Sequence, residues 1–219
     1  MIEAVIFDMD GVIFDTERIY LETWEKVFKD YGYNFRREVY IKCMGRGRKV
    51  VKQVFLEEFG KNLPIEEIYI KKDQELFKII EKEGVPLKEG AVELLDFLNK
   101  NNIKVALATS AKSDRTNAML DDKKIREKFD YIVTGENVEK LKPNPDIFLK
   151  AAKGINVKPE NAVVIEDSKS GVLAGFNANM KVFHIEDLLA PDEEIKKYAF
   201  KMFKSLNQIK EYLESVIKK

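Results

Sequence analysis

The chain has 219 residues, of which 45% are hydrophobic and 35% are charged, and its 38 basic and 38 acidic residues give no net charge at neutral pH. This composition supplies enough apolar material for a large core and excludes an intrinsically disordered chain. Because the charge is balanced, nothing favours nucleic acid or an anionic membrane as a partner. We find no secretory leader and no apolar run long enough to span a membrane, so we expect a cytoplasmic protein. The balanced charge and the lack of an obvious exposed apolar run favour a monomer.

Two residue types are scarce, and this narrows the chemistry. His184 is the single histidine, so a catalytic triad or a multi-histidine zinc site would depend on it alone. We interpret it as a strand-end residue without a catalytic role. Cys43 is the single cysteine, which excludes an intrachain disulfide. A phosphate-binding Cys-x5-Arg loop would need arginine where Lys49 stands, so Cys43 is predicted to be a small buried apolar residue.

The first predicted element is a buried strand over Ala4–Phe7, which is followed directly by Asp8, Met9, Asp10 and Gly11. Residues two apart in an extended segment point the same way, so both aspartates should face one pocket and Met9 the opposite side. The glycine lets the backbone turn where a side chain would obstruct it. Two carboxylates this close repel each other unless a cation or a proton relieves them. The stretch therefore predicts a metal site or an aspartate that is kept as an acid.

The next part of the chain, residues 15–84, has helical patterns but no convincing strand. Two apolar stripes are visible, one of Leu21, Trp24, Phe28 and Tyr31 and a looser one of Val50, Val54 and Phe55. The segment Lys82–Ala91 contains two glycines and a proline and is typical of a linker. We therefore predict a helical cap domain over residues 15–84, inserted into a core domain made of residues 1–14 and 85–219. An insertion at this point is expected to place the cap over the two aspartates.

The rest of the chain alternates strands and helices. Strands are predicted at Ile103–Ala108, Tyr131–Thr134, Ala162–Ile165 and Lys181–Ile185. Two apolar helical stripes are visible, one of Ala91, Leu94, Leu95 and Leu98 and one of Leu206, Ile209, Leu213 and Val216. A further helix is predicted to begin within Lys142–Phe148, with Asn144 as its cap and Pro145 in its first turn. Apolar strands separated by helices indicate a parallel sheet covered on both faces. The predicted fold class is therefore α/β, a doubly wound parallel sheet with an inserted all-helical cap.

Ligands of such sheets bind beyond the carboxyl ends of the strands, so the residues that follow each strand matter most. These are Thr109 and Ser110 after the second strand, Lys142 after the third, and Glu166, Asp167 and Ser168 after the fourth. Taken singly, Asp167 and the residues with hydroxyl groups are typical of helix caps. Lys142 on its own is typical of a solvated surface residue. Together with Asp8 and Asp10 they predict a hard cation with oxygen ligands, for which Mg²⁺ fits, and a place for phosphate oxygens.

Four short motifs resemble the signature motifs of the haloacid dehalogenase superfamily. In chain order they are Asp8-Met9-Asp10-Gly11-Val12 with Thr16, then Thr109-Ser110, Lys142-Pro143 and Glu166-Asp167-Ser168. Their order and spacing agree with the family, and the resemblance covers the whole chain. A helical insert after the first motif is similar to the C1 cap of the β-phosphoglucomutase-like phosphatases and mutases. The dehalogenases themselves lack the second aspartate, so Asp10 favours phosphoryl transfer.

The resemblance implies a role for each of these residues. Asp8 would be the nucleophile that forms an aspartyl-phosphate, and Asp10 would be the general acid and base. Mg²⁺ would be bound by the carboxylates of Asp8 and Asp167 and the backbone carbonyl of Asp10, with Glu166 nearby or joined through water. Thr109, the amide of Ser110 and Lys142 would bind the oxygens of the phosphoryl group in flight.

Two activities stay open. The leading one is a Mg²⁺-dependent phosphomonoester hydrolase of a small phosphorylated metabolite. The alternative is β-phosphoglucomutase, a sugar phosphate isomerase that uses the same aspartates. Arg48 falls where the mutase has a substrate-phosphate arginine, and Lys71 or Lys72 where it has a cap lysine, whereas Tyr20 replaces a histidine of the sugar mutases. A solvated arginine at the start of a helix is the other interpretation of Arg48.

Other classes fit less well. A phosphonatase would need a Schiff-base lysine in the cap, and nothing in the sequence singles one out. A receiver-like regulator that is phosphorylated on aspartate also has acids at strand ends, but it needs no cap. A catalytically inactive binding protein would not need every acid of the mechanism. Multiple turnover on a phosphoester would separate an enzyme from the last two classes.

Overall fold

The computed structural model describes residues 2–41 and 48–217. Within it the chain forms two compact units, one of Met1–Asp15 and Leu87–Lys219 and the other of Thr16–Pro86. We refer to them as the core unit and the cap unit. The boundaries lie one and two residues beyond those expected from the sequence. Cys43 and the glycine-rich stretch Gly45–Gly47 lie outside the described residues.

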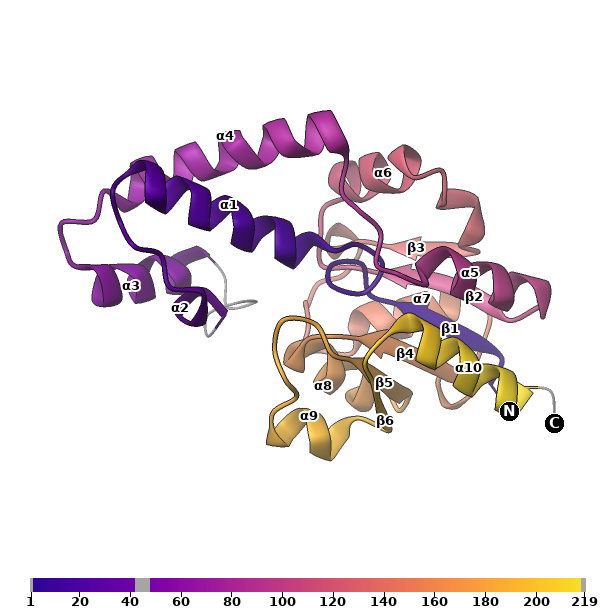
Figure 1. Ribbon diagram of the computed structural model, residues 1–219. Helices are drawn as coiled ribbons and strands as arrows, with labels where there is room; N and C mark the ends of the chain where they lie inside the picture. Colours follow the sequence, from indigo (N-terminus) through magenta and orange to yellow (C-terminus); the bar gives the residue numbers. More distant parts are fainter. Residues whose placement is uncertain (1, 42–47, 218–219) are drawn as a thin grey trace. The chain divides into compact units, whose positions relative to one another are not determined.

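The core unit is built on a six-stranded sheet in which every neighbouring pair of strands is parallel (Figure 1). The strands are β1 (Ala4–Phe7), β2 (Lys104–Ala108), β3 (Tyr131–Val133), β4 (Ala162–Glu166), β5 (Lys181–Ile185) and β6 (Lys201–Phe203), in the spatial order β3-β2-β1-β4-β5-β6. Phe7, the last residue of β1, pairs with Leu107 on one side and with Ile165 on the other. The carboxyl ends of these three central strands therefore meet at one edge of the sheet.

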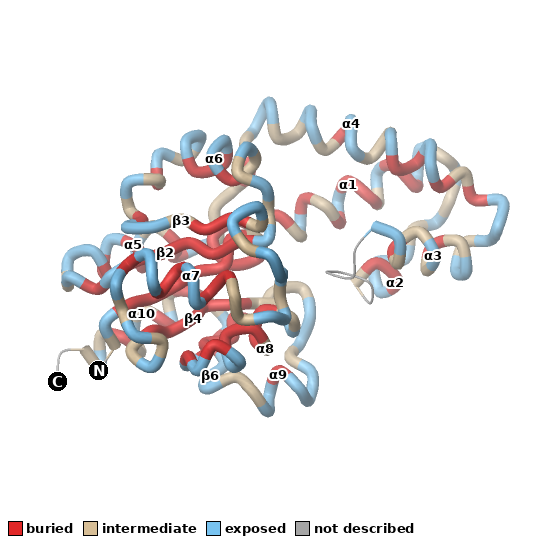
Figure 2. The backbone as a smooth tube through the Cα atoms, turned by 180° about the vertical axis from the view of Figure 1, so that it is seen from behind, coloured by how far each residue is buried: buried red, intermediate tan, exposed pale blue. Residues whose placement is uncertain are grey.

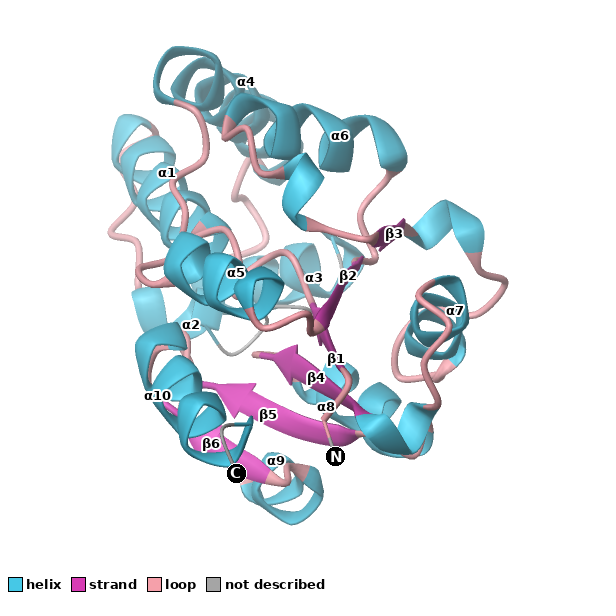
Figure 3. Cartoon of the chain, turned by 90° about the vertical axis from the view of Figure 1, so that its right-hand side faces the viewer, coloured by secondary structure: helices cyan, strands magenta, loops and turns pink. Residues whose placement is uncertain are grey.

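Helices cover both faces of the sheet, as the run of apolar strands predicts. Helices α5 (Ala91–Lys100) and α10 (Leu206–Ile217) pack together on one face, and α7 (Asp146–Gly154) and α8 (Lys169–Asn177) pack on the other (Figure 3). Because successive strand residues point to opposite faces, Ala4 and Ile6 join the core under α7 and α8. The central strands β1, β2 and β4 are almost entirely buried, as Figure 2 shows for β2 and β4.

The remaining elements of the core unit are short and lie between these helices and strands. They are the helices α6 (Ser113–Asp122) and α9 (Glu193–Tyr198) and the 3₁₀ turns η1 (Arg126–Lys128), η2 (Gly135–Asn137) and η3 (Pro159–Asn161). The strand order reverses its direction between β1 and β4, since β2 and β3 lie on one side of this pair and β5 and β6 on the other. In open α/β sheets the crevice at such a reversal is where ligands bind.

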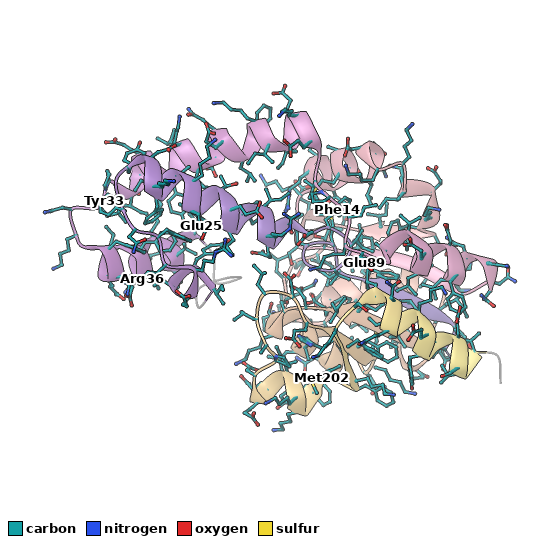
Figure 4. All side chains as sticks on the ribbon, viewed as in Figure 1. Phe14, Glu25, Tyr33, Arg36, Glu89 and Met202 are labelled. Carbon is teal, nitrogen blue, oxygen red and sulfur yellow. The ribbon has the colours of Figure 1, made fainter. Side chains whose placement is uncertain are left out.

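The cap unit contains only helices among its described residues: α1 (Thr16–Asp30), α2 (Arg37–Ile41), α3 (Arg48–Phe59) and α4 (Ile65–Glu83). Its core is aromatic, with Trp24 and Phe28 of α1 packed edge to face against Phe55 of α3, each pair at 5.1 Å between ring centroids. Arg37 donates two hydrogen bonds to Glu25, which is labelled in Figure 4. Large rings bury much area per residue, so a few of them stabilise a small unit.

The two segments that lead into and out of the cap unit are joined within the core unit. Phe14, labelled in Figure 4, forms an isolated antiparallel bridge with Leu87, and the amide of Lys88 donates to the carbonyl oxygen of Ile13 at 2.9 Å. Phe14 is fully buried. The insertion therefore leaves and re-enters the core at one hydrogen-bonded point.

The structure corrects three details of the sequence analysis. Strand β6 was not predicted; it is a three-residue edge strand whose Met202 is exposed (Figure 4), so it lacks an apolar run. Helix α7 begins at Asp146, so Pro145 precedes its first turn, and the side chain of Asn144 donates to the carbonyl oxygen of Leu141 without capping the helix. In α3 the buried face is formed by Val51 and Phe55. Among the described residues, no helix is both long and apolar enough to cross a membrane.

Candidate active site

The loop after β1 presents two aspartates at the edge of the sheet. The amide of Asp8 donates to the carbonyl oxygen of Ile165 in β4, and the amides of Ile13 and Phe14 both donate to that of Met9, each at 3.0 Å. This closes a tight loop that needs a left-handed residue, and Gly11 supplies it with φ of +74°. Met9 is fully buried. The carboxylates of Asp8 and Asp10 instead accept hydrogen bonds from two charged side chains, Lys142 and Arg115.

Lys142 joins the acids of β1 and β4. Its ammonium group donates to Oδ1 of Asp8, to Oε1 of Glu166 at 2.7 Å and to the carbonyl oxygen of Ala108 at 3.2 Å. The side chain is only 6% exposed, so the sequence-based alternative of a solvated lysine is wrong. Burial by itself would lower the pKa of Lys142, but the two carboxylates outweigh burial and raise it, and the amine is charged at neutral pH.

Asp8 is buried beside this ammonium group. Burial raises the pKa of its carboxyl to about 7, while Lys142 opposes the rise and Glu166 and Asp10 add to it. A divalent cation next to Asp8 would favour the anionic form, because an opposite charge within a few ångströms stabilises a carboxylate. The ionisation of Asp8 is therefore sensitive to what is bound beside it.

Glu166 at the end of β4 is fully buried and has hydrogen-bond partners on both oxygens. Lys142 donates to Oε1, and the amide and hydroxyl of Ser168 donate to Oε2 at 2.8 and 2.9 Å. Gly171 in α8 makes room for it, since a Cβ there would lie 1.7 Å from Oε1. Ser168 also caps α8 by accepting from the amide of Gly171 at 3.1 Å. Glu166 is thus fixed in place by the start of the helix that follows it.

Asp167 completes a set of three acids. Asp8, Glu166 and Asp167 each offer one carboxylate oxygen, and these oxygens lie within 4.8 Å of one another. Hard divalent cations take oxygen ligands in such arrangements, so the donor set fits Mg²⁺. The residues present are suited to the cation that the sequence predicts.

His184 forms a hydrogen bond with the backbone of the loop that carries Asp167. Its Nε2 lies 3.0 Å from the backbone oxygen of Asp167, and because a carbonyl oxygen can only accept, Nε2 carries the proton. The ring is fully buried, and burial lowers the pKa of His184, so it is neutral at pH 7. The contact fixes the backbone that carries Asp167.

The remaining predicted site residues lie at the end of β2 and in the cap unit. Thr109 is buried, and its hydroxyl accepts from the amide of Ala111 at 3.1 Å, whereas Ser110 is exposed. Arg48 begins α3 and belongs to the cap unit, where its guanidinium lies 4.2 Å from the ring centroid of Tyr69 and 3.4 Å from Asp73. The structure thus brings Asp8, Lys142, Glu166 and Asp167 into contact range and places Thr109 on the neighbouring strand end.

Three residues that no motif indicates also lie at this edge. Arg115 of α6 donates to the carboxylate of Asp10. Asp187, two residues beyond β5, accepts from the ammonium group of Lys88. The only signal for Asp187 in the sequence is that it follows a predicted strand, and Arg115 and Lys88 come from a helix and a linker.

Comparison with known proteins agrees with this geometry. Residues 5–185 match the family described as haloacid dehalogenase-like hydrolase. A "Phosphorylated carbohydrates phosphatase" of Thermotoga maritima is 35% identical over 179 residues, which cover 82% of each chain. The "(DL)-glycerol-3-phosphatase 2" of Arabidopsis thaliana is 34% identical over 199 residues, which cover 85% of this chain and 80% of that one.

A solved structure extends the similarity to the whole fold. It is a Thermotoga maritima protein assigned as a beta-phosphoglucomutase, with a TM-score of 0.81 and 30% identity, and the alignment covers 98% of this chain and 100% of the other. The match therefore includes the inserted helices as well as the sheet.

Proposed function

Because the chain belongs to the haloacid dehalogenase-like hydrolases, we propose that it is a Mg²⁺-dependent phosphatase of a small phosphorylated metabolite that works through an aspartyl-phosphate on Asp8. The family assignment confirms the resemblance predicted from the four motifs. Within the family, the chain is an enzyme of the phosphatase and β-phosphoglucomutase-like group. The substrate class is proposed from the phosphorylated carbohydrate and glycerol phosphate named for its relatives.

One observation carries the proposal. Asp8, a buried carboxylate, contacts the buried ammonium of Lys142, and its oxygen lies within 4.8 Å of carboxylate oxygens of Glu166 and Asp167. A purely structural role would not call for three buried or half-buried acids around one lysine at the strand-order reversal. A site for a phosphoryl group does, because the nucleophile must be fixed while positive charge balances the phosphate.

The residues divide the reaction as follows. An oxygen of Asp8 attacks phosphorus and forms an acyl phosphate while the bond to the leaving oxygen breaks, and Asp10 gives that oxygen a proton. Asp10 then takes a proton from a water molecule that attacks phosphorus and releases inorganic phosphate, which restores Asp8. Lys142, Thr109 and the amide of Ser110 neutralise and orient the phosphoryl oxygens. Mg²⁺, bound by Asp8, Asp167 and the carbonyl of Asp10 with Glu166 beside them, would supply further positive charge to those oxygens.

A mutase is the second candidate, and the structural similarity to an assigned beta-phosphoglucomutase favours it. Both activities need the same aspartyl-phosphate and differ in whether water or a sugar hydroxyl attacks it. Tyr20, in the place of a histidine of the sugar mutases, favours the phosphatase. We therefore expect free phosphate as the main product.

A panel of phosphorylated metabolites tests this, with β-glucose 1-phosphate and a bisphosphate primer included. We expect phosphate release that stops with excess EDTA, returns with Mg²⁺ and is absent from Asp8→Asn, whose amide cannot act as the nucleophile. Asp10→Asn should be slower by roughly 10²–10⁴-fold, as for a lost general acid. Undiminished turnover in EDTA would contradict the metal site. Conversion of β-glucose 1-phosphate to glucose 6-phosphate with little free phosphate would favour the mutase.

A further inference from the structure

Asp187 lies at the same edge of the sheet as the proposed cation site, and no motif includes it. It follows β5 by two residues, and its side chain is 8% exposed. Its Oδ1 accepts from the ammonium of Lys88, which also lies 3.7 Å from a carboxylate oxygen of Asp15. All three residues belong to the core unit. The ion pair with Lys88 therefore fixes the orientation of the Asp187 carboxylate through its Oδ1.

The other half has no hydrogen-bond partner among the described residues. Oδ2 of Asp187 is a buried oxygen without a donor. Buried carboxylate oxygens are almost always satisfied in folded proteins, so an exception indicates an absent partner. The orientation imposed by Lys88 aims this oxygen at something that the protein alone does not provide.

The glycine of the first motif shows where that oxygen points. A Cβ placed on Gly11 would lie 3.3 Å from Oδ2 of Asp187 and 2.3 Å from Oδ2 of Asp167. The two carboxylate oxygens therefore converge on the same small space, which exists because residue 11 has no side chain. Two anionic oxygens that face one space repel each other unless a proton donor or a cation lies between them.

We propose that Asp187 is an outer carboxylate of the divalent cation site, whose Oδ2 accepts a hydrogen bond from a water molecule of the bound Mg²⁺. Lys88 is then a positioning residue that holds the opposite oxygen of Asp187. The inference rests on the proposed function, since it deepens the same cation site. Mg²⁺ keeps several of its waters when it binds to proteins, and those waters need acceptors. Acceptors of this kind orient the metal-bound groups and raise affinity.

The purely structural alternative is that Asp187 serves only as the partner of Lys88 near the linkers. On that account, removal of its carboxylate would weaken the fold and leave the affinity for Mg²⁺ unchanged. On our account, the affinity falls and the fold without metal is less affected. Affinity for the cation and stability in EDTA therefore separate the two.

The experiment measures Mg²⁺ binding to the full chain by isothermal titration calorimetry and Mn²⁺ binding by electron paramagnetic resonance. Neither needs turnover. The variants are Asp187→Asn, Lys88→Met and Asp167→Asn, with Asp96→Asn as the matched control, because Asp96 is also an aspartate paired with a lysine but lies on α5 away from the motifs. Melting temperatures in EDTA report on the fold.

We expect Asp187→Asn to weaken Mg²⁺ binding by about 10- to 100-fold, the usual effect of removing an outer partner, and Lys88→Met to weaken it by less. Asp96→Asn should bind like the native chain. Native affinity in Asp187→Asn, together with weak binding in Asp167→Asn, would overturn this inference and leave the proposed function standing. A native chain that binds neither ion would overturn both. Metal binding without turnover on any phosphoester would remove the proposed function and leave the role of Asp187 intact.

Discussion

The guanidinium of Arg115 donates two hydrogen bonds to the carboxylate of Asp10, from Nη1 to Oδ2 at 3.0 Å and from Nη2 to Oδ1 at 2.5 Å. A fork of this kind fixes the orientation of a carboxylate. Asp10 is the proposed general acid, and a general acid must carry a proton and reach the leaving oxygen. If Asp10 acts as proposed, we expect the contact with Arg115 to open so that the carboxyl can turn towards the leaving oxygen.

Arg115→Met tests this. The two side chains are 37% and 26% exposed, so the pair contributes at most about 1 kcal/mol, and its removal should raise kcat on an aryl phosphate by up to about fivefold. Steady-state kinetics measures the effect, and Arg126→Met, which breaks an exposed pair with Asp121, should change nothing. A tenfold or larger fall in kcat/KM for Arg115→Met would instead place this arginine among the groups that bind substrate.

Gly171→Ala should unfold or disable the protein although alanine is the better helix former. In an exposed helix interior the change would stabilise by about 1 kcal/mol. Here the added Cβ would lie 1.7 Å from Oε1 of Glu166, which is buried and tied to Lys142, so the crowding should cost about 1–3 kcal/mol or more and displace the lysine. Urea unfolding and phosphatase activity should both fall. Lys169→Ala, at an exposed position of the same helix, is the control and should keep both.

Arg48→Ala separates contact with the substrate from a role in the cap unit. If Arg48 binds the remote part of the substrate, kcat/KM for the true metabolite should fall while turnover of a small aryl phosphate barely changes. Loss of its contact with Tyr69 should lower the melting temperature by only about 2–4 °C, as expected for about 1 kcal/mol. Lys52→Ala is the matched control, since Lys52 also lies on α3 and over the Tyr69 ring. Equal losses on both substrates would place Arg48 in the phosphoryl site, and no loss would make it a surface residue.

Glu75 gives the cap unit a predictable response to acid. It is buried in α4, where hydrogen bonds from Lys26 and Lys78 lower its pKa from 4.5 to about 2. A lowered pKa means that the folded state favours the carboxylate, so this stabilisation is complete above pH 4.5 and is lost as the pH falls towards 2. The difference in melting temperature between the native chain and Glu75→Gln should therefore be largest near pH 7 and shrink below pH 4.5. Glu81→Gln, an exposed change in the same helix, should show no such trend; a constant difference for Glu75→Gln would contradict the assignment.

Periodicity alone could predict most of the fold. The strands from Ala4–Phe7 to Lys181–Ile185 are continuous apolar runs, because both faces of the sheet are covered, and the predicted α/β class is confirmed. Strand β6 could not be predicted, because an exposed three-residue edge strand needs no apolar pattern. Asn144 was misjudged because its amide bonds backward to Leu141, and the sequence gives no sign of that choice.

Only those residues of the candidate site that follow a strand in the sequence could be predicted. Asp8, Lys142, Glu166 and Asp167 follow strands in motifs, so the shared edge of a parallel sheet is enough to gather them. Arg115 and Lys88 reach this edge from a helix and from the return linker, and long side chains of that kind carry no spacing signal. The raised pKa of Lys142 and the Asp187 oxygen without a hydrogen-bond donor depend on the positions of atoms, which a sequence pattern does not encode.

The bridge between Phe14 and Leu87 has a consequence for how such a protein can change over evolutionary time. The segments that lead into and out of the insertion are hydrogen-bonded to each other at its base, so the two ends of any insert would be held together within the core unit. One recombination event could exchange the whole insert and keep every strand of the sheet in register. The proposed catalytic residues, from Asp8 to Asp167, all belong to the core unit, so such an exchange would leave them unchanged.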